Sequence, residues 1–180
     1  MKRIPVYFSF AFILIPLLLG CKKVGYVQFN LDYQAAITIQ SGAGISIPLS
    51  ILTPDIESNS QSEFAINDTR KDKVENIRLT AMSLEITSPN GQEFDFVEDL
   101  ELFISADGVD EIVLAYVYDM DNSVGNFINI TCSQSDFQEY IKKDKFTLRV
   151  RTVTDEYNLS DVDISINCTF RVNAKLIGNA

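Results

Sequence analysis

The sequence predicts an all-β protein, folded as a single antiparallel β-sandwich with one short helix near residues 135–143. Three observations lead to this prediction. Short segments of alternating apolar and polar residues recur at hairpin spacing, turn-forming residues separate them, and one stretch carries a helix signal. The clearest strand covers residues 162–172, where every second residue is apolar and the others are polar or charged. About nine strands at such spacing are typical of two packed antiparallel sheets.

The first part of the chain contains three predicted strands. Residues 26–31 and 36–40 are the first two, and residues 45–51 alternate strictly between aliphatic and small or proline residues. Pro48 cannot donate a hydrogen bond to a neighbouring strand, so we expect the third strand to lie at a sheet edge or to be bulged. Residues 53–61 are polar and predict a long loop.

A long strand is predicted over residues 76–87. Its apolar residues begin on one face and continue on the other, which indicates a β-bulge near Thr80-Ala81. The turn signal that follows, Ser88-Pro89-Asn90-Gly91, is strong, because proline fixes the first corner and Asn-Gly accepts positive φ. We expect this turn to close a hairpin onto residues 93–96.

The middle of the chain continues the sheets. Residues 100–104 alternate, and the Ala-Asp-Gly sequence at 106–108 predicts a turn. Residues 112–118 are apolar on both faces, which is typical of a central strand. A loop over 119–125 precedes a further strand over 127–132.

The predicted helix begins with a capping box formed by Ser135 and Gln138, and it ends near residues 142–143. Strands over 146–151 and 162–172 complete the domain, which we expect to be Ig-like in the broad sense. The apolar side chains of the helix form one stripe that should close one end of the sandwich: Phe137, Tyr140 and Ile141.

The composition excludes several kinds of chemistry. The chain has 180 residues and contains neither His nor Trp. Without His there is no Ser-His-Asp or Cys-His catalysis and no His-ligated zinc. The formal net charge of −10 opposes contact with phosphate backbones, so we expect no nucleic-acid partner. We also expect no cofactor and no metal.

The first 21 residues have the layout of a secretory signal. Residues 1–3 are positively charged at Lys2 and Arg3, residues 4–19 are almost wholly apolar, and Gly20 precedes Cys21. The apolar run is shorter than the roughly 20 residues of a spanning helix and contains two prolines. We therefore interpret this segment as a cleaved signal rather than as a membrane helix.

The residues Leu18-Leu19-Gly20-Cys21 resemble the lipobox of bacterial lipoproteins, Leu-x-Gly/Ala-Cys. The resemblance implies that the Cys21 sulfur receives diacylglycerol, that the chain is cut before Cys21, and that the new amine is acylated. It divides the chain into a signal peptide at 1–20, a lipidated cysteine with a short tether at 21–25, and a β-sandwich domain at 26–180.

The residues after Cys21 bear on location. In enterobacterial lipoproteins an Asp at this point marks inner-membrane retention, and in Bacteroidota lipoproteins acidic residues there mark surface export. This chain has Lys22 and Lys23 instead, followed by Val24 and Gly25. The resemblance therefore implies the outer membrane, facing the periplasm. Four extended residues span at most about 14 Å, so we expect the domain to lie close to the membrane.

Two further cysteines, Cys132 and Cys168, both fall on the apolar face of predicted strands. In an oxidising periplasm they would form a disulfide if their strands were neighbours with Cα atoms about 5.5 Å apart. Alternatively they are two buried free thiols that act as small apolar residues. The sequence leaves both alternatives open.

Acidic residues do not define a catalytic site in this sequence. The turns at 107–111 and 119–122 are rich in Asp, but neither has the Gly and Glu positions of an EF-hand calcium loop. Glu98, Asp99 and Glu101 are close in sequence, and glycoside hydrolysis uses paired carboxylates, yet adjacency along a chain does not define a cleft. We expect no catalytic residue and no enzymatic activity.

Taken whole, the layout resembles the small β-sandwich lipoproteins of Bacteroidota. It implies a lipid-anchored cell-envelope lipoprotein acting as a non-enzymatic interaction or structural module, with an envelope protein as partner. The alternative is a glycan or small-molecule binding module that uses Tyr, Asp and Asn from loops at 53–70 and 119–126. An exposed row of Tyr beside a groove would favour the alternative. Unpaired edge backbone near Pro48 or on the last strand would favour strand addition to a protein.

Overall fold

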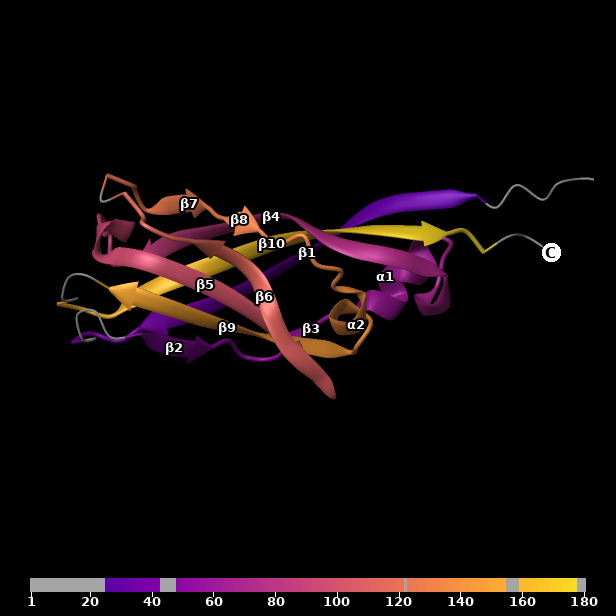
Figure 1. Ribbon diagram of the computed structural model, residues 1–180, viewed down its shortest axis with the longest axis horizontal. Helices are drawn as coiled ribbons and strands as arrows, with labels where there is room; N and C mark the ends of the chain where they lie inside the picture. Colours follow the sequence, from indigo (N-terminus) through magenta and orange to yellow (C-terminus); the bar gives the residue numbers. More distant parts are fainter. Residues whose placement is uncertain (1–24, 43–47, 122, 155–158, 178–180) are drawn as a thin grey trace, which may run out of the picture.

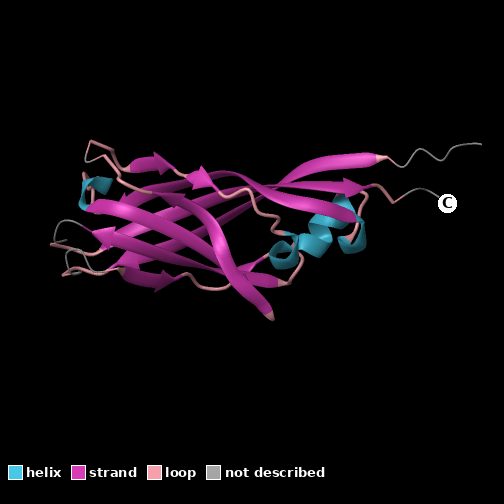
Figure 2. Ribbon diagram, in the orientation of Figure 1, coloured by secondary structure: helices cyan, strands magenta, loops and turns pink. Residues whose placement is uncertain are grey.

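The computed structural model describes residues 25–42, 48–121, 123–154 and 159–177 (Figure 1). Two antiparallel sheets pack face to face, which confirms the predicted all-β sandwich (Figure 2). The four-stranded sheet has the order β1-β10-β4-β7, with strands β1 (Tyr26–Ile39), β10 (Val162–Lys175), β4 (Val74–Ser88) and β7 (Phe127–Asn129).

The six-stranded sheet has the order β2-β9-β5-β6-β8, and β3 also pairs with β9. Its strands are β2 (Leu49–Leu52), β3 (Ile56–Glu57), β5 (Val97–Ala106), β6 (Val109–Val117), β8 (Thr131–Cys132) and β9 (Lys145–Thr154). The helical elements are α1 (Ser60–Ile66), α2 (Gln138–Ile141) and two short 3-10 turns, η1 (Lys71–Lys73) and η2 (Phe94–Phe96).

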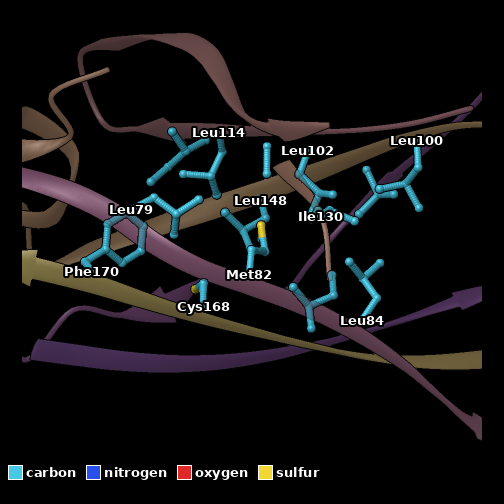
Figure 3. Close-up of a cluster of buried hydrophobic side chains, with 14 of the residues drawn as sticks. Leu79, Met82, Leu84, Leu100, Leu102, Leu114, Ile130, Leu148, Cys168 and Phe170 are labelled. Carbon is cyan, nitrogen blue, oxygen red and sulfur yellow. The ribbon is translucent and has the colours of Figure 1, made fainter. Parts of the chain in front are cut away.

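The core lies between the two sheets. Figure 3 shows Leu84 and Phe170 of the four-stranded sheet and Leu102 and Leu148 of the six-stranded sheet among its buried side chains, all four of which are fully buried. Along β10 every second residue is buried, as the sequence predicts. The alternation gives each sheet one apolar face, and burying the two faces against each other stabilises the fold.

The first two predicted strands are one continuous strand. β1 pairs with β10 over 14 residues without a shift in register. The expected break at 32–35, between the strands predicted at 26–31 and 36–40, is wrong, although Asp32 and Gln34 are polar. Both are exposed, while Tyr33 and Ala35 continue the inward-facing row, so the alternation never stops.

The predicted loop at 53–61 is wrong in part. It contains β3 and leads into α1, so the chain has a second α-helix beyond the one expected. Phe64 anchors α1, being fully buried and 6.0 Å from the ring of Phe29. A seven-residue helix with one buried aromatic residue has too short an apolar pattern to be recognised from the sequence.

The bulge in β4 is confirmed, because the pairing with β10 shifts between Leu79 and Ala81 and leaves Thr80 as the extra residue. The hairpin expected after residues 88–91 is wrong. The turn forms, but it carries the chain from β4 in one sheet to β5 in the other. The intervening residues form η2, whose Phe94 and Phe96 are buried in the core.

The hairpin between β5 and β6 forms at Gly108, as predicted. β6 pairs with β5 along most of its length but with β8 at two positions, so it lies next to an edge and is less central than expected. The strand predicted over 127–132 is divided between the sheets, because β7 pairs with β4 and β8 pairs with β6. Ile130 lies between them and is buried.

The predicted helix exists as α2, but the capping box does not form, and the helix starts at Gln138. The Ser135 hydroxyl instead bonds Ser133, and the carboxylate of Asp136 accepts the backbone N–H groups of Ile77 and Gln138. The predicted apolar stripe is buried, and α2 contacts strands of both sheets.

Candidate functional site

β1 forms one outer edge of the four-stranded sheet. Within the described residues, no backbone hydrogen bond joins β1 to β2 or β3. The Leu176 N–H donates to the Gly25 carbonyl at 2.8 Å. In an antiparallel pair the hydrogen-bonded positions alternate, so the odd-numbered residues of β1 direct their backbone N–H and C=O groups toward β10. The even-numbered residues of β1 therefore direct their backbone N–H and C=O groups away from the sheet.

This edge lacks the features that usually protect an edge strand, namely short length, Lys, Pro or a bulge. β1 is 14 residues long and regular in register, and Asp32 is its one charged residue. The other edge strands differ. β2 has four residues and follows Pro48, β7 has three residues and β8 has two, so the prediction of an edge strand beside Pro48 is confirmed.

Four polar side chains on the solvent face of β1 bond their cross-strand partners on β10. Thr38 bonds Asp163 at 2.7 Å, and Asp32 bonds Thr169 at 2.6 Å. The other two such pairs are Gln28 with Asn173 and Gln34 with Ser165. These bonds fix the side chains without occupying the outward backbone groups.

A groove runs between β1 and the segment that follows β2. Two adjoining hollows of about 460 and 300 Å³ share Asp32 and Tyr33, and they are bounded by residues 30–36 on one side and by residues of the segment 54–63 on the other. A third hollow of about 520 Å³ shares Glu57, Ser58 and Asn59 with them and is lined by no residue of β1. We refer to them together as the β1 groove. A fourth hollow of about 290 Å³ lies further along the same edge, between Thr38–Gly42 and Leu49–Ile51.

The wall of the β1 groove is held by buried hydrogen bonds. The Tyr33 hydroxyl donates to the Ser58 carbonyl at 2.7 Å, and the Ser58 N–H donates to the Asp144 carbonyl at 2.8 Å. The Ser58 hydroxyl also bonds the Lys143 carbonyl. Burial raises the pKa of Tyr33 above its ordinary value, so its hydroxyl remains a donor. The groove is thus preformed.

The β1 groove is negatively charged. Asp32, Glu57 and Glu63 lie along it, and none of them forms an ion pair with another described residue. Two neighbouring carboxylates are compensated, since Asp55 pairs with Lys145 and Asp144 with Lys71. The uncompensated charge favours a cationic occupant.

The two loops proposed for ligand binding do not come together. Residues 53–70 border the β1 groove and lead into η1 before β4 begins, whereas Asn126 accepts a hydrogen bond from Ile86 near the other end of β4. Figure 1 places α1 and the start of β7 at opposite ends of the molecule. Among the described residues the two loops line no common site.

No exposed row of Tyr lines the groove in the described residues, since Tyr33 is the one tyrosine bordering it and its ring packs against Phe146 at 5.1 Å. Tyr116 and Tyr118 stack at 5.2 Å elsewhere, on the six-stranded sheet. The hollow beside Tyr118 has a volume of about 70 Å³, which is small for a sugar ring.

Two of the three carboxylates considered for catalysis are engaged in contacts, and one of these is Asp99, which accepts the Asp119 N–H at 3.1 Å. Glu101 accepts the Tyr118 hydroxyl at 2.6 Å and pairs with Arg151 at 2.7 Å. The hydrogen bond from Tyr118, followed by the contact with Arg151, lowers the pKa of Glu101, which keeps it ionised. In the described part of the chain no three Asp, Glu or Cys side chains are placed to bind a metal.

Cys132 and Cys168 are free thiols in the structure, on β8 and β10 of different sheets. Of the two alternatives that the sequence left open, the second was two buried free thiols, and Cys168 alone is buried. Cys168 is buried and its Sγ donates to the Tyr33 carbonyl at 3.7 Å, while Cys132 is half-buried.

The two thiols should differ in reactivity. Burial raises the pKa of Cys168 to about 12 and also raises the pKa of Cys132. Because the thiolate is the nucleophile, we expect iodoacetamide at pH 8 to spare Cys168 in the native protein and to label Cys132 slowly. Peptide mass spectrometry measures both sites. In urea the two should react alike, and equal labelling in the native state would contradict the prediction.

Cys21 and the lipobox lie outside the described residues. No helix in the described ranges combines the length and the apolar character needed to cross a bilayer.

Sequence reasoning named the loop at 53–70, which borders the β1 groove, but it missed the other wall of the groove, residues 30–36. A usable signal was present in β1, because Tyr33 and Ala35 continue the alternation of the flanking segments and no Lys, Pro or Gly interrupts it. The position of β1 at an edge depends on pairing with β10, more than a hundred residues away, and has no local signal.

The sequence matches no family model and no curated protein. Among solved structures, the chain is similar to one titled Desmodium yellow mottle tymovirus, with 12% identity, a TM-score of 0.31 and coverage of 87% of this chain and 94% of that chain. A structure titled turnip yellow mosaic virus gives 9% identity and a TM-score of 0.31, with coverage of 87% and 99%. TM-scores this far below 0.5 establish neither a common fold nor a common function.

Proposed function

We propose that this chain is a lipid-anchored lipoprotein of the cell envelope, on the outer membrane and facing the periplasm, that acts as a non-enzymatic interaction module. It binds an extended segment of an envelope protein by strand addition to β1. The observation that carries the proposal is the unprotected 14-residue edge of β1 beside a preformed groove. Main-chain hydrogen bonds to the edge supply affinity, and side-chain contacts along the groove supply specificity.

The chemistry of the β1 groove favours a segment rich in Lys or Arg. An added strand would have Asp32 beside it on β1 and Glu57 and Glu63 across the groove. A second copy of this chain fits less well. If two β1 edges paired in antiparallel over their full length, Asp32 would lie opposite Asp32 or Gln34 of the other copy. The two Asp32 carboxylates would then lie close together near the centre of the pairing, and like charges at such positions are destabilising.

We expect Ala36→Lys to reduce partner binding at least about tenfold, a loss of about 1.4 kcal/mol. Ala36 is exposed, lies at an outward-facing position of β1 and borders the groove. A lysine there places a charge on the edge, as natural edge strands do to prevent pairing, and it repels a basic segment. Ala81→Lys is the matched control, because Ala81 is also exposed but lies on β4, inside the same sheet.

The measurement is photo-cross-linking in intact cells from a benzophenone amino acid at Gln34, an outward-facing position of the same edge. The expected product joins position 34 to a Lys- or Arg-containing segment of one envelope protein, and the yield falls with Ala36→Lys but not with Ala81→Lys. Cross-links to a second copy alone, an absence of protein cross-links, or equal yields in both variants would each refute the proposal.

A glycan or small-molecule site is the second candidate. The observation in its favour is the hollow of about 520 Å³ lined by polar residues between Glu57 and Ser62. It predicts binding of a soluble glycan on an array that persists with Ala36→Lys, because that hollow does not include Ala36. Strand addition predicts no such binding.

A further inference from the structure

One end of the sandwich exposes three large apolar side chains. Tyr26 begins β1 and is 64% exposed, Ile66 ends α1 and is 74% exposed, and Ile177 follows β10 and is 43% exposed. We call these three residues the apolar end. Figure 1 shows the start of β1, the end of β10 and α1 gathered at one end of the molecule.

Backbone contacts hold the apolar end together. The Ile177 N–H donates to the Asp68 carbonyl at 2.8 Å, two residues beyond Ile66. Tyr26 is directly opposite Lys175 in the register of β1 and β10, and the Thr69 hydroxyl donates to the Lys175 carbonyl at 2.7 Å. Three segments far apart in the sequence therefore meet at this end of the molecule.

The fold itself does not use these side chains. α1 is anchored by Phe64, which is fully buried, while Ile66 points out to solvent. Clustered exposed apolar residues mark interaction surfaces, whereas single ones are ordinary. The remaining large exposed apolar residues are spread over other elements: Leu52, Tyr118, Phe127 and Leu159.

The charge around the apolar end differs from that of the whole chain. Residues 68–75 together with Lys175 contain four basic and three acidic residues, while the chain carries a net charge of −10. Lys73 forms no ion pair with another described residue. This local balance of charge repels an anionic surface less than the net charge of the whole chain would.

We infer that the apolar end rests on the surface of a bilayer containing anionic phospholipids, with Tyr26, Ile66 and Ile177 at the headgroup level. The inference rests on the lipid anchor of the proposed function. Cys21 precedes Gly25 by four residues, which reach at most about 14 Å, and Gly25 leads directly into β1 at this end. Tyr is favoured at such interfaces because its ring is apolar and its hydroxyl stays hydrated.

The absence of Trp from the chain allows a direct test. Ile66→Trp introduces a single fluorophore at the apolar end. Leu159→Trp is the matched control, because Leu159 is 98% exposed and lies near the end of β10 that is far from the apolar end. Leu159 comes shortly before Val162, the first residue of β10, and this 14-residue strand spans about 45 Å at roughly 3.3 Å per residue. Each lipidated variant is reconstituted into vesicles of phosphatidylcholine and phosphatidylglycerol, with and without bromine on the acyl chains.

We expect brominated lipid to quench the emission of the Ile66→Trp variant and its spectrum to shift to the blue, with neither effect in the Leu159→Trp variant. Equal quenching of the two variants, or none in either, overturns the inference. Flotation of the vesicles separates the two failures. If the protein floats with the vesicles but its Trp is not quenched, the lipid anchor is present and the contact of the apolar end with the bilayer is refuted. If the protein does not float, the result contradicts the lipid anchor as well.

Discussion

Replacing Phe170 by Ala should lower the free energy of unfolding by about 3–5 kcal/mol, the cost of removing a large aromatic side chain from a core. Phe170 is fully buried on β10, and its ring lies 6.0 Å from that of Tyr33, 5.7 Å from Phe137 and 6.5 Å from Phe146. These partners come from β1, the start of α2 and β9. One ring therefore joins both sheets and the helix that closes the end of the sandwich.

Urea denaturation followed by circular dichroism measures this loss. Phe127→Ala is the matched control, because Phe127 is 51% exposed on the short edge strand β7. We expect the control to change the free energy of unfolding by less than about 1 kcal/mol, because surface substitutions usually have small effects. Similar losses for the two variants would mean that the aromatic cluster is not the centre of the core.

Cys21→Ala should move the protein from the membrane fraction to the soluble fraction and abolish its labelling with radioactive palmitate. Each buried CH₂ of an acyl chain contributes about 0.8 kcal/mol, and two or more chains give stable anchoring, so loss of the acceptor sulfur removes the anchor. Cell fractionation with immunoblotting measures the distribution.

Cys132→Ala provides the control for Cys21→Ala, because it removes a thiol from a half-buried strand position and leaves residues 18–21 unchanged. We expect that variant to remain in the membrane fraction. A Cys21→Ala protein that stays membrane-bound with residues 1–20 attached would show that the N-terminal segment is not a lipoprotein signal.

Local patterns predicted the elements whose burial follows from a simple alternation. β10 appears where every second residue from Val162 is apolar, and the bulge in β4 appears where the apolar face changes at Thr80. The Gly108 turn joins two strands that pair with each other, so local turn chemistry sufficed. In each case the deciding interactions lie within a few residues.

The errors concern which sheet a segment joins. The turn at 88–91 has the chemistry of a hairpin turn, but Phe94 and Phe96 are buried between the sheets and β5 pairs with β9. Residues 127–132 have the sequence pattern of one strand, but they form β7 in the four-stranded sheet and β8 in the six-stranded sheet. The β1 wall of the groove was missed for the same reason, because it depends on β1 being an edge and on the hydrogen bond from the Tyr33 hydroxyl to the Ser58 carbonyl. These are contacts between distant parts of the chain.

The unbroken ladder between β1 and β10 has a mechanical consequence. Tension applied through the N-terminal segment reaches the described fold at Gly25 and is directed along β1. Hydrogen bonds of an antiparallel pair run perpendicular to the strands, so such a pull shears the 14-residue ladder as a whole and does not open it one bond at a time. A strand added to the other edge of β1 would be loaded in the same way, so that force between a membrane and a bound partner would pass along β1.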